Sequence, residues 1–255
     1  MTIDQALLYS QCPMRYYMST YLGISNNTVT FSGQLDSIIS TCIYSYAFRE
    51  IDINALAVAM RRFDKLSEKI VLPTEVRGSP KKKQLYDEKI STSREKLRYA
   101  LGIIHDLAPE DIIGSPYQYE LNIDGTIVEG IIDIIMIVGG VHHVVTLDMH
   151  HTYPSEDYLN RGIKCTIACN VFKKLLPEPR EYKLIHFNIY NNYYAEVQRN
   201  DSQLTSIDYE LRSIVGNINR SIGDGQWYRA KSLLCNSCYA NSPCEDLYRR
   251  LSNYG

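Results

Sequence analysis

The chain has 255 residues, of which 45% are hydrophobic and 22% are charged, and its formal net charge is −2. The length suffices for one large domain or two small ones, and the composition is that of an ordinary globular protein. The near-neutral charge excludes a wholly basic nucleic-acid coat but leaves room for a local basic groove. Seven cysteines are too few, in so long a chain, for a secreted scaffold held by disulfides.

Two further features bear on the compartment. The first residues, MTIDQALLYS, lack the basic and apolar regions of a signal peptide. No apolar run reaches the roughly 18–20 residues that cross a membrane. We therefore expect a cytoplasmic protein of a reducing compartment, with no membrane among its partners.

Apolar residues at helical spacing predict helices over 3–22, 33–49, 53–70 and 84–106. Within the first of these, Pro13 indicates that a new helix begins there, because proline is favoured in a first turn. The linker 71–83 carries two prolines, a glycine and three consecutive lysines. This composition predicts an exposed loop.

The centre of the chain changes to an alternating pattern. Residues 117–123, 126–138 and 142–148 are predicted to form a three-stranded antiparallel meander, because Asp124-Gly125 and Gly139-Gly140 are turn sequences. The middle strand is apolar on both faces, which predicts that both are covered. Further on, the pattern predicts helices over 156–175 and 203–222, and a strand over 182–190 in the same sheet. His142 and His143 are expected to be an exposed pair.

Two aspartates stand out in this central region. Asp133 lies within the apolar stretch GIIDIIMIV, where a carboxylate is costly unless it is paired, hydrogen-bonded or metal-bound. Asp148 ends the neighbouring predicted strand, and His150 would face the same side if the strand continued. Two carboxylates converging from adjacent strands suit a divalent cation that activates water for phosphodiester hydrolysis. The structural alternative is that Asp133 caps a helix and Asp148 merely ends a strand.

Four cysteines form the other candidate site. Cys235, Cys238 and Cys244 are spaced C-x2-C-x5-C, and Cys12 lies near the opposite terminus in QCPMRYY. Thiolates are soft ligands, and four of them suit a tetrahedral zinc or a 4Fe–4S cluster. Such a centre would hold the N- and C-terminal regions together. The other cysteines, on predicted apolar helix faces, are expected to be buried core thiols: Cys42, Cys165 and Cys169.

These motifs together resemble the PD-(D/E)XK nuclease superfamily. The segment G-I-I-D at 130–133, a hairpin and an apolar-Asp pair at 147–148 are similar to the core of its RecB-like branch. The cysteine spacing, with aromatic residues beside it, is similar to the iron–sulfur subgroup, which includes the AddB subunit of bacterial helicase–nucleases and CRISPR-associated RecB-like exonucleases. The resemblance implies a restriction-endonuclease-like α/β core with a central mixed sheet flanked by helices. It also implies a 4Fe–4S cluster on Cys12, Cys235, Cys238 and Cys244.

On this basis residues 1–255 are interpreted as a single nuclease-like domain, with a helical insertion at 50–113 and an iron–sulfur segment at 223–255. The pattern of the family's active site is incomplete, however. His150 stands where the family has lysine, and Ser37, beside Asp36, stands where its first-helix histidine is expected. No Gln-x-x-x-Tyr motif occurs within 157–175.

Two readings of this altered site follow. In one, the site is active: Asp133 and Asp148 bind Mg²⁺ or Mn²⁺, His150 acts as ligand or base, and Lys164 from the next helix replaces the missing lysine. In the other, which the loss of all three supporting residues favours, the fold binds DNA ends or single strands and cleavage is weakened or lost. A third hypothesis is a non-catalytic structural subunit of a larger phage or mobile-element complex, with protein partners.

Overall fold

The computed structural model describes residues 1–24, 30–47, 53–70, 72, 79–150, 152–175, 181–232, 235–236 and 238–252. The chain divides into two compact units, each built from separate stretches. Unit 1 comprises Met1–Thr28, Glu120–Gly130 and Thr205–Gly255, and unit 2 comprises Val29–Tyr119 and Ile131–Leu204. The interpretation of residues 1–255 as a single nuclease-like domain stays a prediction.

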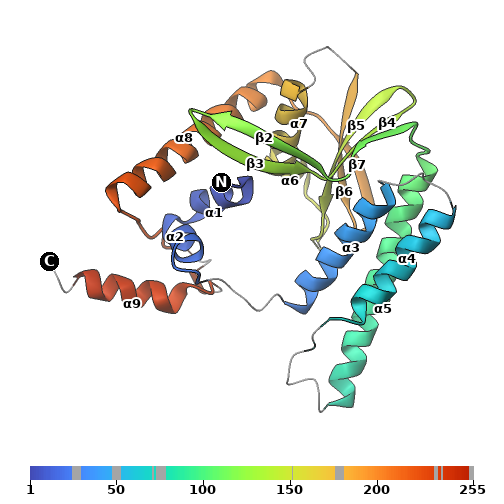
Figure 1. The fold of residues 1–255 in the computed structure, drawn as a ribbon, viewed down its shortest axis with the longest axis horizontal. Coiled ribbons are helices and arrows are strands. Elements are labelled where there is room, and N and C mark those ends of the chain that lie inside the picture. The colour runs from blue at the N-terminus through green and yellow to red at the C-terminus, as the bar shows by residue number, and fades with distance from the viewer. Residues whose placement is uncertain are drawn as a thin grey trace. The chain divides into compact units, whose positions relative to one another are not determined.

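Unit 2 contains a five-stranded mixed sheet in the order β1-β4-β5-β6-β7 (Figure 1). Its strands are β1 (Asp111–Gly114), β4 (Ile134–Val138), β5 (Val141–Asp148), β6 (Tyr182–Asn188) and β7 (Tyr193–Val197). β5 and β6 run parallel, whereas the other neighbouring strands are antiparallel. The predicted α/β class with a mixed sheet flanked by helices is thus confirmed.

A helical crossover joins the two parallel strands, as parallel pairing requires. It contains α6 (Glu156–Arg161) and α7 (Ile163–Leu175), which are separated at Gly162. α7 lies on β5 and β6 and buries one continuous run of its residues, Cys165–Phe172. Thr146 of β5 contacts Cys165, and His142 contacts Phe172. The even-numbered side chains of β5 therefore face α7.

The opposite face of the sheet is covered by three helices, α3 (Phe31–Ala47), α4 (Ile53–Ser67) and α5 (Pro80–Asp106). Their apolar side chains share one core with odd-numbered residues of the strands, among them Val145 and Leu147. Cover on both sides explains why β5 is buried along almost its whole length. The predicted helices are confirmed within a few residues at their ends.

α5 begins earlier than the sequence predicts. Ser79 caps it by accepting a hydrogen bond from the Lys82 backbone N–H over 3.4 Å, and Pro80 occupies the first turn. The three lysines at 81–83 are therefore exposed helix residues, and their placement in a loop was wrong. Most of the remaining predicted linker, 71 and 73–78, lies outside the described residues.

Unit 1 is largely helical, with α1 (Ile3–Gln11), α2 (Pro13–Thr20), most of α8 (Asp201–Asp224), and α9 (Asn241–Ser252). The predicted restart at Pro13 is confirmed, as is the long helix that corresponds to α8. Tyr9 of α1 packs against Ile214 and Ile218 of α8, and its hydroxyl lies 2.9 Å from Ser221 Oγ. These contacts join the first and last parts of the chain within this unit.

The predicted meander was wrong in its middle strand. Residues 126–138 form two strands, β3 (Thr126–Ile132) and β4, which are interrupted at Asp133. β3 pairs with β2 (Tyr117–Ile123) in a separate two-stranded sheet. Alternation of apolar residues continues through both strands, so it gives no sign of this change of partner.

The prediction that His142 and His143 are exposed was also wrong. They are only 4% and 8% exposed, because β5 is a central strand covered on both faces. Cys42, Cys165 and Cys169 are buried, as predicted. In the described part of the chain, every helix is too short or too polar to cross a membrane.

Candidate functional site

Asp133 lies between β3 and β4 and is buried, with 2% of its surface exposed. Tyr44 Oη, from α3, donates to its Oδ1 over 2.5 Å, and the Leu147 backbone N–H, from β5, donates to its Oδ2 over 2.8 Å. The Lys164 ammonium, from α7, lies 2.7 Å from the same Oδ2. Burial and the adjacent carboxylate raise the pKa of Tyr44, which keeps its hydroxyl protonated as a donor. Asp133 thus draws α3, β5 and α7 to one point.

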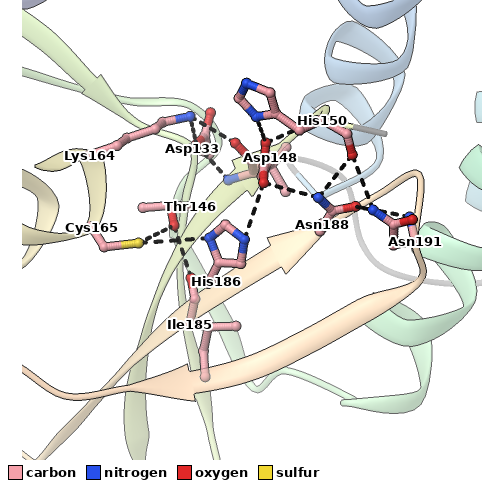
Figure 2. A network of polar contacts seen from close by, with 11 residues as sticks. Asp133, Thr146, Asp148, His150, Lys164, Cys165, Ile185, His186, Asn188 and Asn191 are labelled. Carbon is pink, nitrogen blue, oxygen red and sulfur yellow. Dashed lines mark hydrogen bonds and ion pairs between the residues drawn. The ribbon is translucent and has the colours of Figure 1, made fainter. Parts of the chain in front are cut away.

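Asp148 ends β5 and is also buried, and Figure 2 shows its contacts. Its Oδ1 accepts from the His150 backbone N–H over 3.0 Å and contacts His150 Nδ1. Its Oδ2 accepts from Asn188 Nδ2 over 3.0 Å and lies 3.3 Å from His186 Nε2. Burial alone would raise the pKa of Asp148, but hydrogen bonds from His186, His150 and Asn188 outweigh it and hold that pKa well below its ordinary value.

His186 connects this carboxylate to a buried thiol (Figure 2). Its Nδ1 lies 3.9 Å from Cys165 Sγ, which in turn is 3.0 Å from Thr146 Oγ1. Burial lowers the pKa of His186, but the neighbouring Asp148 and Cys165 outweigh it and raise that pKa to about 9. The imidazole is therefore protonated at neutral pH and forms a buried ion pair with Asp148.

The charges of the network balance. Two carboxylates, Asp133 and Asp148, face two cations, Lys164 and His186. Each of the four carboxylate oxygens has at least one donor or cationic partner from the protein itself. A divalent cation requires carboxylate oxygens that are turned toward it. Among the described residues, no three His, Cys, Asp or Glu side chains are grouped as metal ligands.

The structure brings the four residues predicted for catalysis into one network: Asp133, Asp148, His150 and Lys164. Their roles in catalysis and in binding Mg²⁺ or Mn²⁺ stay predictions. The side chains of His150 and Lys164 are 73% and 54% exposed, so they are the part of the network that solvent reaches. Asp36 contacts a different residue, Tyr190, whose Oη donates to Asp36 Oδ1 over 2.6 Å.

Sequence reasoning missed Tyr44, His186 and Asn188. The signal for the last two is the alternation His-Phe-Asn in β6, which places two polar side chains on one face of a buried strand. Because β5 and β6 are parallel, Thr146 is paired with His186 and Asp148 with Asn188. Nothing local marks Tyr44, since it is one of 21 tyrosines and its partner lies far along the chain.

The four cysteines of the second candidate site all belong to unit 1. Cys12 is the residue between α1 and α2, Cys235 and Cys238 precede α9, and Cys244 lies in its first turn. Cys244 packs against Met14 and Met18, with Cys12 and Cys238 at the edge of the same cluster. Burial raises the pKa of Cys244, Arg229 opposes this, and the charges of the three other cysteines raise it further. The three other cysteines therefore lie near enough to Cys244 to act on its charge.

Arg229 supplies positive charge beside these thiols. Its Nη2 donates to Asn241 Oδ1 over 2.8 Å and lies 3.3 Å from Glu245 Oε1, both on α9. A backbone hydrogen bond from Ser232, over 3.5 Å, lowers the pKa of Cys235, burial opposes this, and Arg229 lowers that pKa further. Thiolate ligands with an apolar wall and a nearby cation suit a zinc or iron–sulfur centre in their chemistry, but the described residues do not place three of these thiols together as metal ligands.

No family model matches the chain, and no characterised protein matches it in sequence. The resemblance to RecB-like nucleases therefore rests on the sequence motifs and stays a prediction.

The ion pair between His186 and Asp148 predicts a specific pH dependence of stability. Because folding raises the pKa of His186 from about 6.5 to about 9, its contribution is complete below pH 6.5 and is lost as the pH rises towards 9. We expect His186→Gln to destabilise the protein at pH 6, by up to about 3 kcal/mol, and much less at pH 9.5. Urea unfolding at both pH values measures the difference.

The control for this prediction is His105→Gln, because His105 is an exposed residue in the last turn of α5. Its effect on the free energy of unfolding should be small at both pH values. An equal loss of stability for His186→Gln at pH 6 and pH 9.5 would show that the imidazole carries no charge in the folded protein.

Proposed function

We propose that this chain is an iron–sulfur protein with a nuclease-related core that binds DNA, at ends or single strands, and whose metal-dependent cleavage is weakened or lost. The observation that carries the proposal is the charge balance around Asp133 and Asp148. Lys164 and His186 occupy carboxylate oxygens that an active site would present to a divalent cation. The PD-(D/E)XK resemblance supplies the polynucleotide partner.

The surroundings of the network suit a polyanion. His150 and Lys164 are its exposed residues, at the edge of the sheet where β5 ends. A cation at the carboxyl end of parallel strands is well placed to contact a phosphate, since ligands of open α/β sheets bind at this edge. In this proposal Lys164 has two partners: Asp133 inside the protein and the DNA backbone outside it.

The cysteine centre has a structural role in the proposal. Cys12, Cys235, Cys238 and Cys244 would hold a 4Fe–4S cluster, which supplies a covalent link between segments far apart in sequence. Closing so long a loop restricts the unfolded chain strongly. Arg229 would balance part of the negative charge of the thiolates and holds α9 through Asn241 and Glu245.

A second candidate function, an active Mg²⁺- or Mn²⁺-dependent exonuclease, is supported by Lys164. Its ammonium lies 2.7 Å from Asp133 and is half exposed, so a lysine is present beside the carboxylates although none occupies position 150. Phosphate entering the site would then draw Lys164 away from Asp133 and leave that carboxylate for the metal. The two functions differ in whether cleavage products form.

We predict that the wild-type protein binds labelled single-stranded DNA at low salt and forms no products with Mg²⁺ or Mn²⁺. Lys164→Ala should weaken binding by about 3- to 10-fold, because one phosphate contact is lost. The matched control is Lys65→Ala, an exposed lysine in the last turn of α4. Fluorescence anisotropy measures the affinity, and denaturing electrophoresis detects products. Metal-dependent products that Asp133→Asn and Asp148→Asn abolish would establish the exonuclease instead.

We also predict that protein purified without oxygen is brown and contains about four iron atoms per chain. Cys12→Ser should lose most of the iron and the visible absorption, although Cys12 lies more than 200 positions from the other three cysteines. Cys42→Ala is the control, since Cys42 belongs to the core beneath the sheet of unit 2. A colourless protein that contains one zinc atom per chain would contradict this prediction and indicate a zinc site in place of the cluster.

A further inference from the structure

Unit 1 carries a group of aromatic side chains that has no role in the proposed function. Tyr17 is stacked on Trp227, with ring centroids 5.1 Å apart and planes at 22°, and on Tyr21, at 5.8 Å and 26°. Tyr21 and Trp227 are themselves 5.5 Å apart. We call Tyr17, Tyr21 and Trp227 the aromatic surface. Tyr21 is 49% exposed, and Tyr17 and Trp227 are partly exposed.

Packing within the protein holds these rings in place. Trp227 also contacts Tyr9 and Tyr16, which belong to the buried core between α1 and α8. The Met14 backbone N–H donates to the carbonyl of Tyr228 over 3.0 Å and so fixes the Trp227 segment to the start of α2. The rings are therefore preorganised, and stacking of a ligand on them costs little conformational entropy.

The two segments that form the aromatic surface carry positive charge alone. Residues 13–24 contain Arg15, and residues 226–232 contain Arg229 and Lys231, and neither segment contains an aspartate or glutamate, although the chain has 29 acidic residues. Lys231 is exposed, and the Arg15 guanidinium lies over the Tyr239 ring at 5.1 Å. Arg229 is already paired with Glu245, whereas Lys231 is exposed, and flat ring faces beside such a cation complement a ligand that combines bases with phosphates.

We propose that the aromatic surface binds the unpaired bases of a single-stranded nucleic acid by stacking, with Tyr21 as the outermost ring. The inference rests on the proposed function and deepens it, because it assigns base contacts to unit 1 and leaves phosphate contacts at the network of unit 2 unchanged. Stacking tolerates any base, so the surface selects single strands over duplex and not one sequence over another.

Trp227 provides the readout, because it is the only tryptophan in the chain. Full-length wild-type protein is titrated with oligothymidine and with an abasic deoxyribose-phosphate strand of the same length, while Trp227 emission and strand anisotropy are recorded. We expect oligothymidine to quench the emission and to bind more tightly than the abasic strand. Tyr21→Ala should weaken binding of oligothymidine by roughly 5- to 100-fold and leave binding of the abasic strand unchanged.

Two control variants complete the test. Tyr21→Phe keeps the ring and should bind as the wild type does, and it tests the inference even if Tyr21→Ala folds poorly. Tyr209→Ala removes a tyrosine of α8 that is 71% exposed and should have no effect.

Two results would overturn the inference and leave the proposed function standing. One is an anisotropy signal that shows strand binding while Trp227 emission does not change. The aromatic surface would then be a candidate contact for a protein partner. The other is equal affinity of Tyr21→Ala and wild type for oligothymidine. Absence of any strand binding by the wild-type protein would overturn the proposed function and this inference together.

Discussion

Two buried carboxylates, Asp133 and Asp148, impose the constraint around which unit 2 is built. Burial of a charge is costly unless cations and hydrogen-bond donors replace water. Here those partners come from α3, β5, β6 and α7, so satisfying two side chains fixes the positions of four elements. The break between β3 and β4 at Asp133 and the parallel pairing of β5 with β6 both serve this arrangement.

The same constraint is the basis of the proposal that cleavage is weakened or lost. A catalytic pair of carboxylates must remain partly unsatisfied until a metal ion binds. In this protein Lys164 and His186 lie against the two carboxylates, and only the contact of His186 is buried on both sides. The four cysteines are a separate candidate site in unit 1, with Arg229 beside them. The proposed function assigns binding to the network of unit 2 and structural stability to the cysteines of unit 1.

The sequence predicted much of this and failed where contacts are distant. Helical periodicity predicted α3, α4 and α8 closely, because each buries one apolar stripe. Alternation of apolar and polar residues predicted β5 and β6. It also predicted one continuous strand through Asp133, because the period of side chains is the same in β3 and β4 although the two strands pair in different sheets. The sequence marks Asp133 as a costly carboxylate and Asp148 as its neighbour, whereas His186, which pairs with Asp148, was missed because only the parallel register brings the two together. α9 and the short strands β1 and β7 gave no local signal strong enough to predict them.

The central claim is that the charge of Asp133 and Asp148 is already balanced inside the protein. Electron paramagnetic resonance of free Mn²⁺, recorded as protein is added, tests it most directly. The account predicts that any Mn²⁺ taken up by the wild-type protein is taken up equally by Asp133→Asn and Asp148→Asn. One bound Mn²⁺ per chain that disappears in both variants would contradict it.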